Sequence, residues 1–197
     1  MLVNASRLIG MPALSLHIGG PTAWTRQAII DPKKLQIVGF YVDGPLVNDD
    51  TGDILETDEI REFAPIGMVI DSVDVLTHGE DAVRLKKIID MDFEFIGLNV
   101  VSKKGEKLGK VSDYVVDTQT FKIMQFTVKR PLFKGFLDPE LILSRKEIVE
   151  IDDEKVIVKD SEEKVKKMAA VARGEKMAAP DYVNPFRGGA YRDSSSE

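Results

Sequence analysis

The feature that most constrains this 197-residue chain is an internal repeat. Residues 30–42 align without a gap on residues 116–128, and residues 45–46 continue the same register against residues 131–132. A repeat of this length indicates that one small module occurs twice. Two copies are too few to form a solenoid, in which repeats depend on many neighbours. Each copy is therefore expected to close most of its own core.

Within each copy, apolar residues recur with the two-residue period of a half-buried strand. The two apolar faces are formed by Val38, Phe40 and Val42, and by Met124, Phe126 and Val128. We therefore expect Phe40 and Phe126 at matching core sites. Turns are expected at residues 31–34 and 117–120, because the Asp that opens each stretch can accept hydrogen bonds from the backbone ahead of it.

Each copy ends on a second match, two residues out of the earlier register: residues 55–60 align with residues 143–148. We interpret each copy as five or six short antiparallel strands, and closing such a sheet into a barrel removes its exposed edges. The predicted fold class is all-β, with two tandem small antiparallel β-barrels, a C-terminal helix and a disordered tail. The predicted segments are a first barrel at 1–78, a linker at 79–92, a second barrel at 93–160, a helix at 161–174 and a flexible tail at 175–197.

Composition excludes several classes of function. The chain has no cysteine, which excludes disulfides, thiol catalysis and cysteine-ligated metals. A net charge of −6 disfavours broad binding of RNA, whose phosphates it repels, and suits a basic partner, of which ribosomal proteins are one class. No apolar stretch approaches the roughly 18 residues of a membrane helix, and residues 1–7 lack a signal-peptide pattern. A cytoplasmic location without a membrane span is expected.

No catalytic constellation is apparent in the sequence. His17 and His78 are the only histidines, and they are far apart. No glycine-rich phosphate loop lies between a strand and a helix. Asp113, flanked by Val111 and Val115, is expected to accept backbone hydrogen bonds at a bend. The sequence therefore predicts no enzyme, no catalytic residue, no cofactor and no metal.

Residues 105–113 read Gly-Glu-Lys-Leu-Gly-Lys-Val-Ser-Asp and precede the second apolar strand, and Ile96-Gly97 opens the copy. In these residues the second copy resembles a PRC-barrel domain. The first copy resembles the same family more weakly. There the central Leu-Gly-Lys is lost, and Gln27 stands where the second copy has Asp113. The two resemblances cover residues 4–78 and 93–160.

This resemblance implies a small β-barrel of the kind found in the H subunit of photosynthetic reaction centres and in the ribosome maturation factor that resembles it. Members of the family act mostly as protein-binding or scaffold modules, and no shared catalytic residue set is implied. The expected function is a non-enzymatic interaction adaptor built from two such modules. The alternative is a ribosome maturation or RNA-processing accessory factor. The expected partner is another protein, and association with a second copy of the chain stays open.

Two segments are candidate contact surfaces. Residues 129–136 mix cations with aromatic rings, which suits an acidic partner or RNA, although these rings can also fold back on the barrel. Residues 181–192 interleave three aromatics with two arginines, which are common at binding hot spots, although this segment can also pack on its own barrel. The candidate residues are Lys129, Arg130, Phe133, Lys134, Phe136, Tyr182, Phe186, Arg187, Tyr191 and Arg192.

Overall fold

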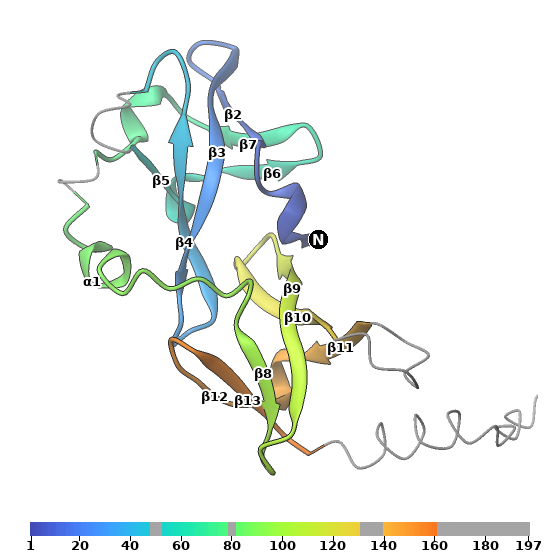
Figure 1. Ribbon diagram of the computed structural model, residues 1–197. Helices are drawn as coiled ribbons and strands as arrows, with labels where there is room; N and C mark the ends of the chain where they lie inside the picture. Colours follow the sequence, from blue (N-terminus) through green and yellow to red (C-terminus); the bar gives the residue numbers. More distant parts are fainter. Residues whose placement is uncertain (48–52, 79–81, 131–139, 161–197) are drawn as a thin grey trace, which may run out of the picture. The chain divides into compact units, whose positions relative to one another are not determined.

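The computed structural model describes residues 1–47, 53–78, 82–130 and 140–160. Residues 1–160 belong to one compact unit, which is mostly β-strand, as predicted (Figure 1). The predicted helix at 161–174, the tail at 175–197 and most of the candidate loop at 129–136 lie outside the described residues. No helix within the described ranges is long and apolar enough to cross a membrane.

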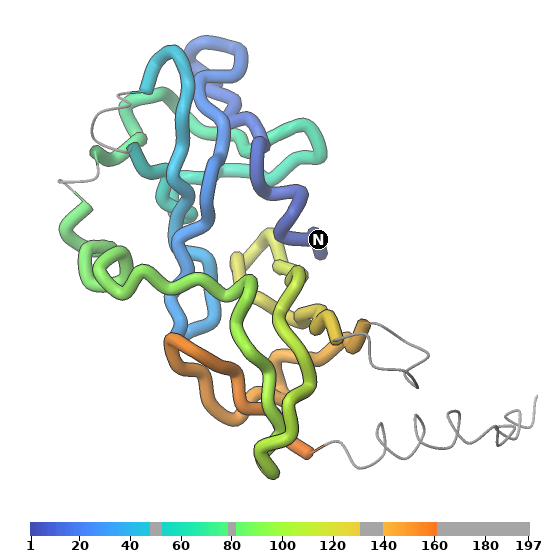
Figure 2. The backbone as a smooth tube through the Cα atoms, viewed as in Figure 1, coloured from blue at the N-terminus to red at the C-terminus, as the bar shows by residue number. Residues whose placement is uncertain are grey.

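The elements fall into two halves, which follow one another along the trace in Figure 2. The first half contains β2 (Pro12–Ser15), β3 (Gly20–Asp31), β4 (Gln36–Asp43), β5 (Ile54–Glu56), the 3-10 helix η2 (Thr57–Glu59), β6 (Glu62–Ala64) and β7 (Gly67–Ile70). The second half contains β8 (Asn99–Ser102), β9 (Lys107–Asp117), β10 (Lys122–Lys129), β11 (Glu140–Ser144), η4 (Arg145–Glu147), β12 (Ile148–Ile151) and β13 (Lys155–Val158). Outside these halves lie β1 (Leu2–Asn4), η1 (Ala5–Arg7), η3 (Val73–Val75) and α1 (Lys86–Ile89).

The strands of the two halves pair in the same order. The first half reads β5-β4-β3-β2-β7-β6 and the second reads β11-β10-β9-β8-β13-β12. Phe40 on β4 lies opposite Leu55 on β5, and Phe126 on β10 lies opposite Leu143 on β11. All four side chains are buried. The prediction that Phe40 and Phe126 occupy matching core sites is therefore confirmed.

Two details of the predicted fold need correction. Not all strand pairs are antiparallel, because β2 pairs with β7 and β8 pairs with β13 in parallel. The sheet is also not closed, so the prediction of two closed barrels is not confirmed. Within the described residues, the chain passes from β5 to β6 through η2, and from β11 to β12 through η4, without a ladder between those strands. A 3-10 turn at these corners replaces the pairing that would complete a barrel.

The two long hairpins turn in the same way at their tips. The Asp31 carboxylate accepts hydrogen bonds from the backbone N–H groups of Lys33, at 2.9 Å, and Lys34, at 3.2 Å. The turn ends at Leu35, whose φ is +47°, and the other hairpin ends equivalently at Phe121, whose φ is +52°. The predicted Asp-directed turns are confirmed, and both tips present their backbone in one shared conformation.

The segment that leads into each half lies against the other half. At the N-terminus, β1 pairs with β9, with Val3 opposite Val116. Between the halves, Leu85 packs against Ile29 of the first half, and α1 contacts β3. We call residues 1–11 the first arm and residues 82–98 the second arm; each arm leads into one half and packs against the other.

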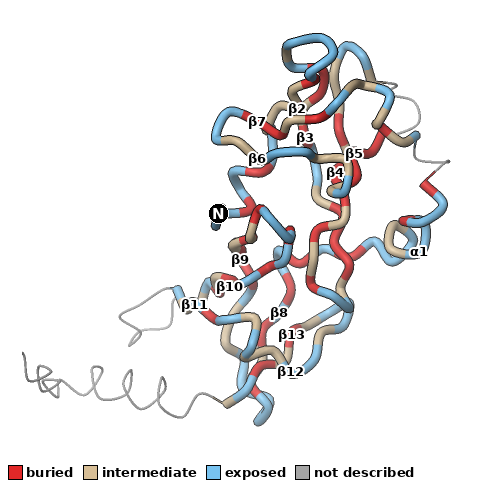
Figure 3. Tube along the Cα trace, turned by 180° about the vertical axis from the view of Figure 1, so that it is seen from behind, coloured by how far each residue is buried: buried red, intermediate tan, exposed pale blue. Residues whose placement is uncertain are grey.

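One hydrophobic core runs through both halves, with buried stretches in each (Figure 3). Phe121 at the tip of the second hairpin meets Phe40 of the first half edge to face, with ring centroids 6.2 Å apart. Phe95, from the second arm, contacts Phe126 in the same manner at 5.4 Å. The first half therefore completes its core with Phe121 of the second half.

Candidate binding site at the seam between the halves

The two hairpin tips meet in a reciprocal pair of backbone hydrogen bonds. The N–H of Ile37 donates to the carbonyl oxygen of Phe121 at 2.9 Å, and the N–H of Ile123 donates to that of Leu35 at 3.0 Å. Each residue corresponds to its counterpart in the repeat, so the contact is approximately two-fold symmetric. We call this junction the seam.

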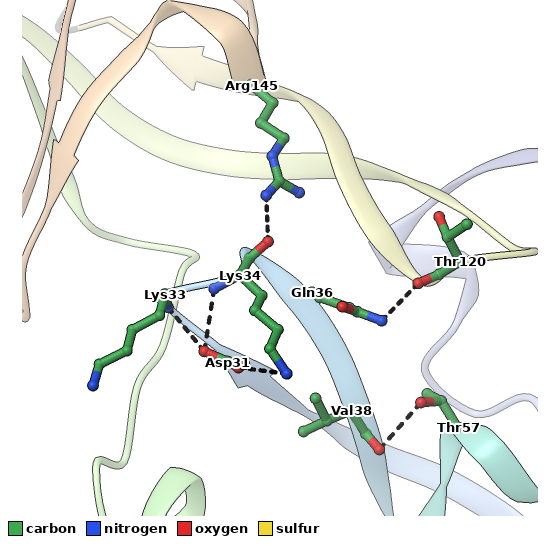
Figure 4. Close-up of polar contacts among 8 residues, drawn as sticks. All are labelled: Asp31, Lys33, Lys34, Gln36, Val38, Thr57, Thr120 and Arg145. Carbon is green, nitrogen blue, oxygen red and sulfur yellow. Dashed lines mark hydrogen bonds and ion pairs between the residues drawn. The ribbon is translucent and has the colours of Figure 1, made fainter.

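On one side of the seam, an arginine crosses between the halves. Arg145, the first residue of η4, donates from Nη1 to the carbonyl oxygen of Leu35 at 3.2 Å. Its Nη2 donates to the carbonyl oxygen of Lys34 (Figure 4). The guanidinium thereby ties the second half to the exposed end of the first hairpin.

The other side of the seam lacks this arginine. The residue equivalent to Arg145 is Thr57, the first residue of η2, and its hydroxyl donates within its own half to the carbonyl oxygen of Val38 at 3.3 Å. The carbonyl oxygen of Thr120 instead accepts from Nε2 of Gln36 at 2.9 Å (Figure 4). Thr57, with a short neutral side chain, therefore occupies the position at which the other half has the long cationic side chain of Arg145.

A pocket of about 770 Å³ opens on this side of the seam, and we call it the seam pocket. One wall is formed by η2 and the start of β6, and another by the tip of the β9–β10 hairpin. Met1 and Gln36 complete the lining. The lining residues are Met1, Gln36, Thr57, Asp58, Ile60, Arg61, Glu62, Phe63, Thr118, Gln119, Thr120, Phe121 and Lys122.

Among the described residues of this lining, two of the three cationic groups are paired with acids that are not part of it. Arg61 Nε lies 2.9 Å from Asp71 Oδ1. The N-terminal ammonium of Met1 lies 3.5 Å from Asp117 Oδ1. Asp58, Glu62 and Lys122 are exposed residues of the same lining, so two carboxylates and one ammonium belong to the pocket wall.

The hydrogen bond from the Thr120 hydroxyl is the main cause of a lowered pKa at Asp117, next to this pocket. The backbone N–H of Gln119 and the N-terminal ammonium lower the pKa in the same direction. Asp117 is therefore held as a carboxylate, and it organises the hairpin tip that forms one wall.

This arrangement is suited to binding. It presents carbonyl and carboxylate oxygens, all of them hydrogen-bond acceptors, on an open polar wall. Among the described residues, no group of three or more His, Asp or Glu side chains is placed to hold a metal ion.

A second, smaller pocket of about 240 Å³ lies where the arms cross. Ser6 Oγ donates to Asp113 Oδ2 at 3.3 Å, and Gln27 Nε2 donates to Glu94 Oε1 at the same distance. Asp113 also accepts from the N–H of Tyr114 at 2.8 Å, which agrees with the structural role predicted for it. Burial raises the pKa of the Tyr114 phenol, with a further contribution from Asp113, so the Tyr114 hydroxyl stays protonated.

Of the candidate contact residues from the sequence, Lys129 and Arg130 are within the described ranges, and neither lines either pocket. Lys129 is exposed at the end of β10, and Arg130 follows it half-buried. The other candidates lie outside the described residues. They are Phe133, Lys134, Phe136, Tyr182, Phe186, Arg187, Tyr191 and Arg192.

Sequence reasoning missed Thr57 and Arg145. The signal was present in the match between residues 55–60 and 143–148, where Thr57-Asp58 opposes Arg145-Lys146. The difference in charge between the two pairs indicates a difference in binding only when the topology is known, because the topology places these residues near the hairpin tip of the opposite half.

The glycine of the PRC-like run has a structural explanation. Gly109 on β9 adopts a φ of +144°, and a Cβ there would collide with the carbonyl oxygen of Lys129 on β10. Only glycine permits this approach of the two strands without strain.

Comparison with known proteins agrees with this geometry. Residues 91–165 match the PRC-barrel domain, so the second half of the chain contains such a domain. The match begins after α1 and includes all six strands from β8 to β13. A search of curated proteins found no match to the chain.

Proposed function

We propose that this chain is a non-enzymatic interaction adaptor built from two PRC-barrel-type modules and acting in the cytoplasm. The observation that carries the proposal is the PRC-barrel domain at residues 91–165, because proteins of that family act mostly as protein-binding or scaffold modules. The first half supports a second module through its equal strand order and its equivalent core positions at Phe40 and Phe126.

The two modules are held in a fixed relation by the seam and the crossed arms, while their surfaces differ. One side of the seam is occupied by Arg145, and the other side opens into the seam pocket. A rigid duplicated scaffold with one unfilled recess presents a preformed surface, which lowers the ordering cost of binding. This difference between the halves favours recognition of a specific partner.

The loop at 129–136 and the peptide at 181–192 belong to the same proposal as further contact surfaces. Both combine aromatic and cationic residues, which predominate in binding hot spots. A second candidate function, a ribosome maturation or RNA-processing accessory factor, rests on the cations and aromatics of the 129–136 loop.

The experiment is a tagged pull-down of the full chain with mass spectrometry, at low and at high salt. The adaptor proposal expects stable recovery of a non-ribosomal protein. Recovery of ribosomal particles that is lost at high salt supports the second candidate instead, because contacts to phosphate weaken steeply with salt. Measured turnover of a small molecule by the purified chain would contradict both.

A further inference from the structure

We propose that the seam pocket binds the guanidinium of an arginine side chain presented by a partner protein. The inference rests on the proposed adaptor function and names the chemistry of its partner. Its basis is the repeat, since the equivalent place across the seam is filled by the chain's own Arg145. The pocket exists where Thr57 has replaced that arginine.

The backbone acceptors on the two sides correspond. Arg145 donates to the carbonyl oxygens of Lys34 and Leu35, which correspond by the repeat to those of Thr120 and Phe121. The Thr120 oxygen already accepts one hydrogen bond, from Gln36. The Leu35 oxygen accepts simultaneously from Arg145 and from the N–H of Ile123. A carbonyl oxygen can accept two hydrogen bonds, so the Phe121 oxygen, which accepts from Ile37, can take a second donor in the same geometry.

The charge difference between the halves points to a cation. Where η4 begins with Arg145-Lys146, η2 begins with Thr57-Asp58, which removes two cations and adds one carboxylate. Glu62 adds a second carboxylate to the pocket wall.

The shape of the acceptors favours arginine over lysine. A planar guanidinium offers five N–H donors in a fixed fork and can bond a carbonyl and a carboxylate at once, whereas an ammonium is a compact point charge. Arg61 does not supply this group, because its guanidinium is engaged with Asp71.

The test is a titration of the full-length, isotopically labelled protein, followed by amide chemical shifts. The probes are a blocked Ala-Arg-Ala peptide and the same peptide with citrulline, the neutral analogue of arginine. We expect the arginine peptide to shift the amides of Thr120, Phe121 and Lys122. The citrulline peptide should bind at least about tenfold more weakly, because hydrogen bonds to charged groups are stronger.

Substitutions at the pocket test whether the arginine peptide binds there. In Thr57→Arg, the chain's own guanidinium fills the recess, so peptide binding should be lost while the melting temperature rises. Asp58→Asn should weaken the arginine peptide several-fold and leave the citrulline peptide unchanged. Asp153→Asn, at an exposed turn of the second half, is the matched control and should bind as the wild type does.

Equal shifts with arginine and citrulline overturn the inference, and so does unchanged binding by a folded Thr57→Arg protein. If Thr57→Arg fails to fold, the arginine and citrulline peptides are compared on Asp58→Asn instead. An unchanged preference for the arginine peptide in that variant then overturns the inference. A protein that recovers a partner in the pull-down yet does not distinguish the two peptides keeps the adaptor function and loses this inference.

Discussion

At the scale of single residues, the repeat allows each side chain to be compared with the one at the equivalent position of the other half. The same position in the fold is occupied by Arg145 in one half and by Thr57 in the other. The first bonds two carbonyls of the opposite half, and the second bonds only within its own half. Arg145 thus bonds across its side of the seam, whereas on the other side Gln36, and not Thr57, bonds across it.

Arg145→Ala should destabilise the protein by about 1–3 kcal/mol, because two carbonyl oxygens lose a charged donor at a partly buried junction. The measurement is urea denaturation. The neighbouring exposed Lys146 provides the control, since Lys146→Ala should change stability by less than about 0.5 kcal/mol. Equal effects of the two substitutions would show that the bridge across the seam has no energetic role.

Asp117 gives the seam a dependence on pH. Its pKa is lowered in the folded protein, mainly by the Thr120 hydroxyl. A lowered folded pKa contributes stability above the unfolded value, near 3.8, and this contribution is lost as the pH falls through the folded pKa. We expect the difference in melting temperature between wild type and Asp117→Asn to shrink as the pH falls below about 4. A difference that stays constant over this range contradicts the assignment.

At the scale of elements, the two-residue period, the Asp turns and the repeat register were sufficient to predict the hairpins and the equivalence of Phe40 with Phe126. These features are local, or are copied between the halves. The parallel pairs β2·β7 and β8·β13 and the crossed arms were not predictable, because they join segments far apart in the sequence. Strand periodicity carries no signal for the direction of the partner strand.

The seam pocket escaped prediction for the same reason. Thr57 and Arg145 were aligned, but only the topology places each of them against a hairpin tip of the opposite half. The predicted helix at 161–174 and the tail at 175–197 lie outside the described residues and stay predictions.

The loop at 129–136 makes a prediction at this scale. Charge reversal at Lys129, Arg130 and Lys134 should weaken recovery of the partner in the pull-down. Lys129 is exposed, so reversal at this position alone should change the stability by less than about 0.5 kcal/mol. Unchanged recovery after the triple change would remove this loop from the functional account.

At the scale of the whole molecule, the two related halves belong to one compact unit of residues 1–160. They share a hydrophobic core, exchange their leading arms and meet in reciprocal hydrogen bonds at the seam. The first half does not bury Phe40 completely without Phe121 of the second half. An adaptor built in this way holds its two modules in one relative position, since separating them would expose the aromatic contact between Phe40 and Phe121.

The fluorescence of Trp24 on β3 reports on the unfolding of the first half, because Trp24 is the only tryptophan of the chain. It can therefore test whether the two halves unfold together. Phe126→Ala, in the core of the second half, should cost roughly 3–5 kcal/mol as a fully buried truncation. Phe40→Ala, at the matching site of the first half, should cost a similar amount and serves as the comparison.

The most direct test of the central claim is therefore thermal unfolding of Phe126→Ala, followed by Trp24 fluorescence and by far-ultraviolet circular dichroism. If the halves fold as one cooperative unit, the two signals give one coincident transition. The Trp24 midpoint should then fall by as much as it does in Phe40→Ala. If the Trp24 transition instead stays at the wild-type temperature while part of the circular dichroism signal is lost earlier, the halves unfold independently and the account is wrong.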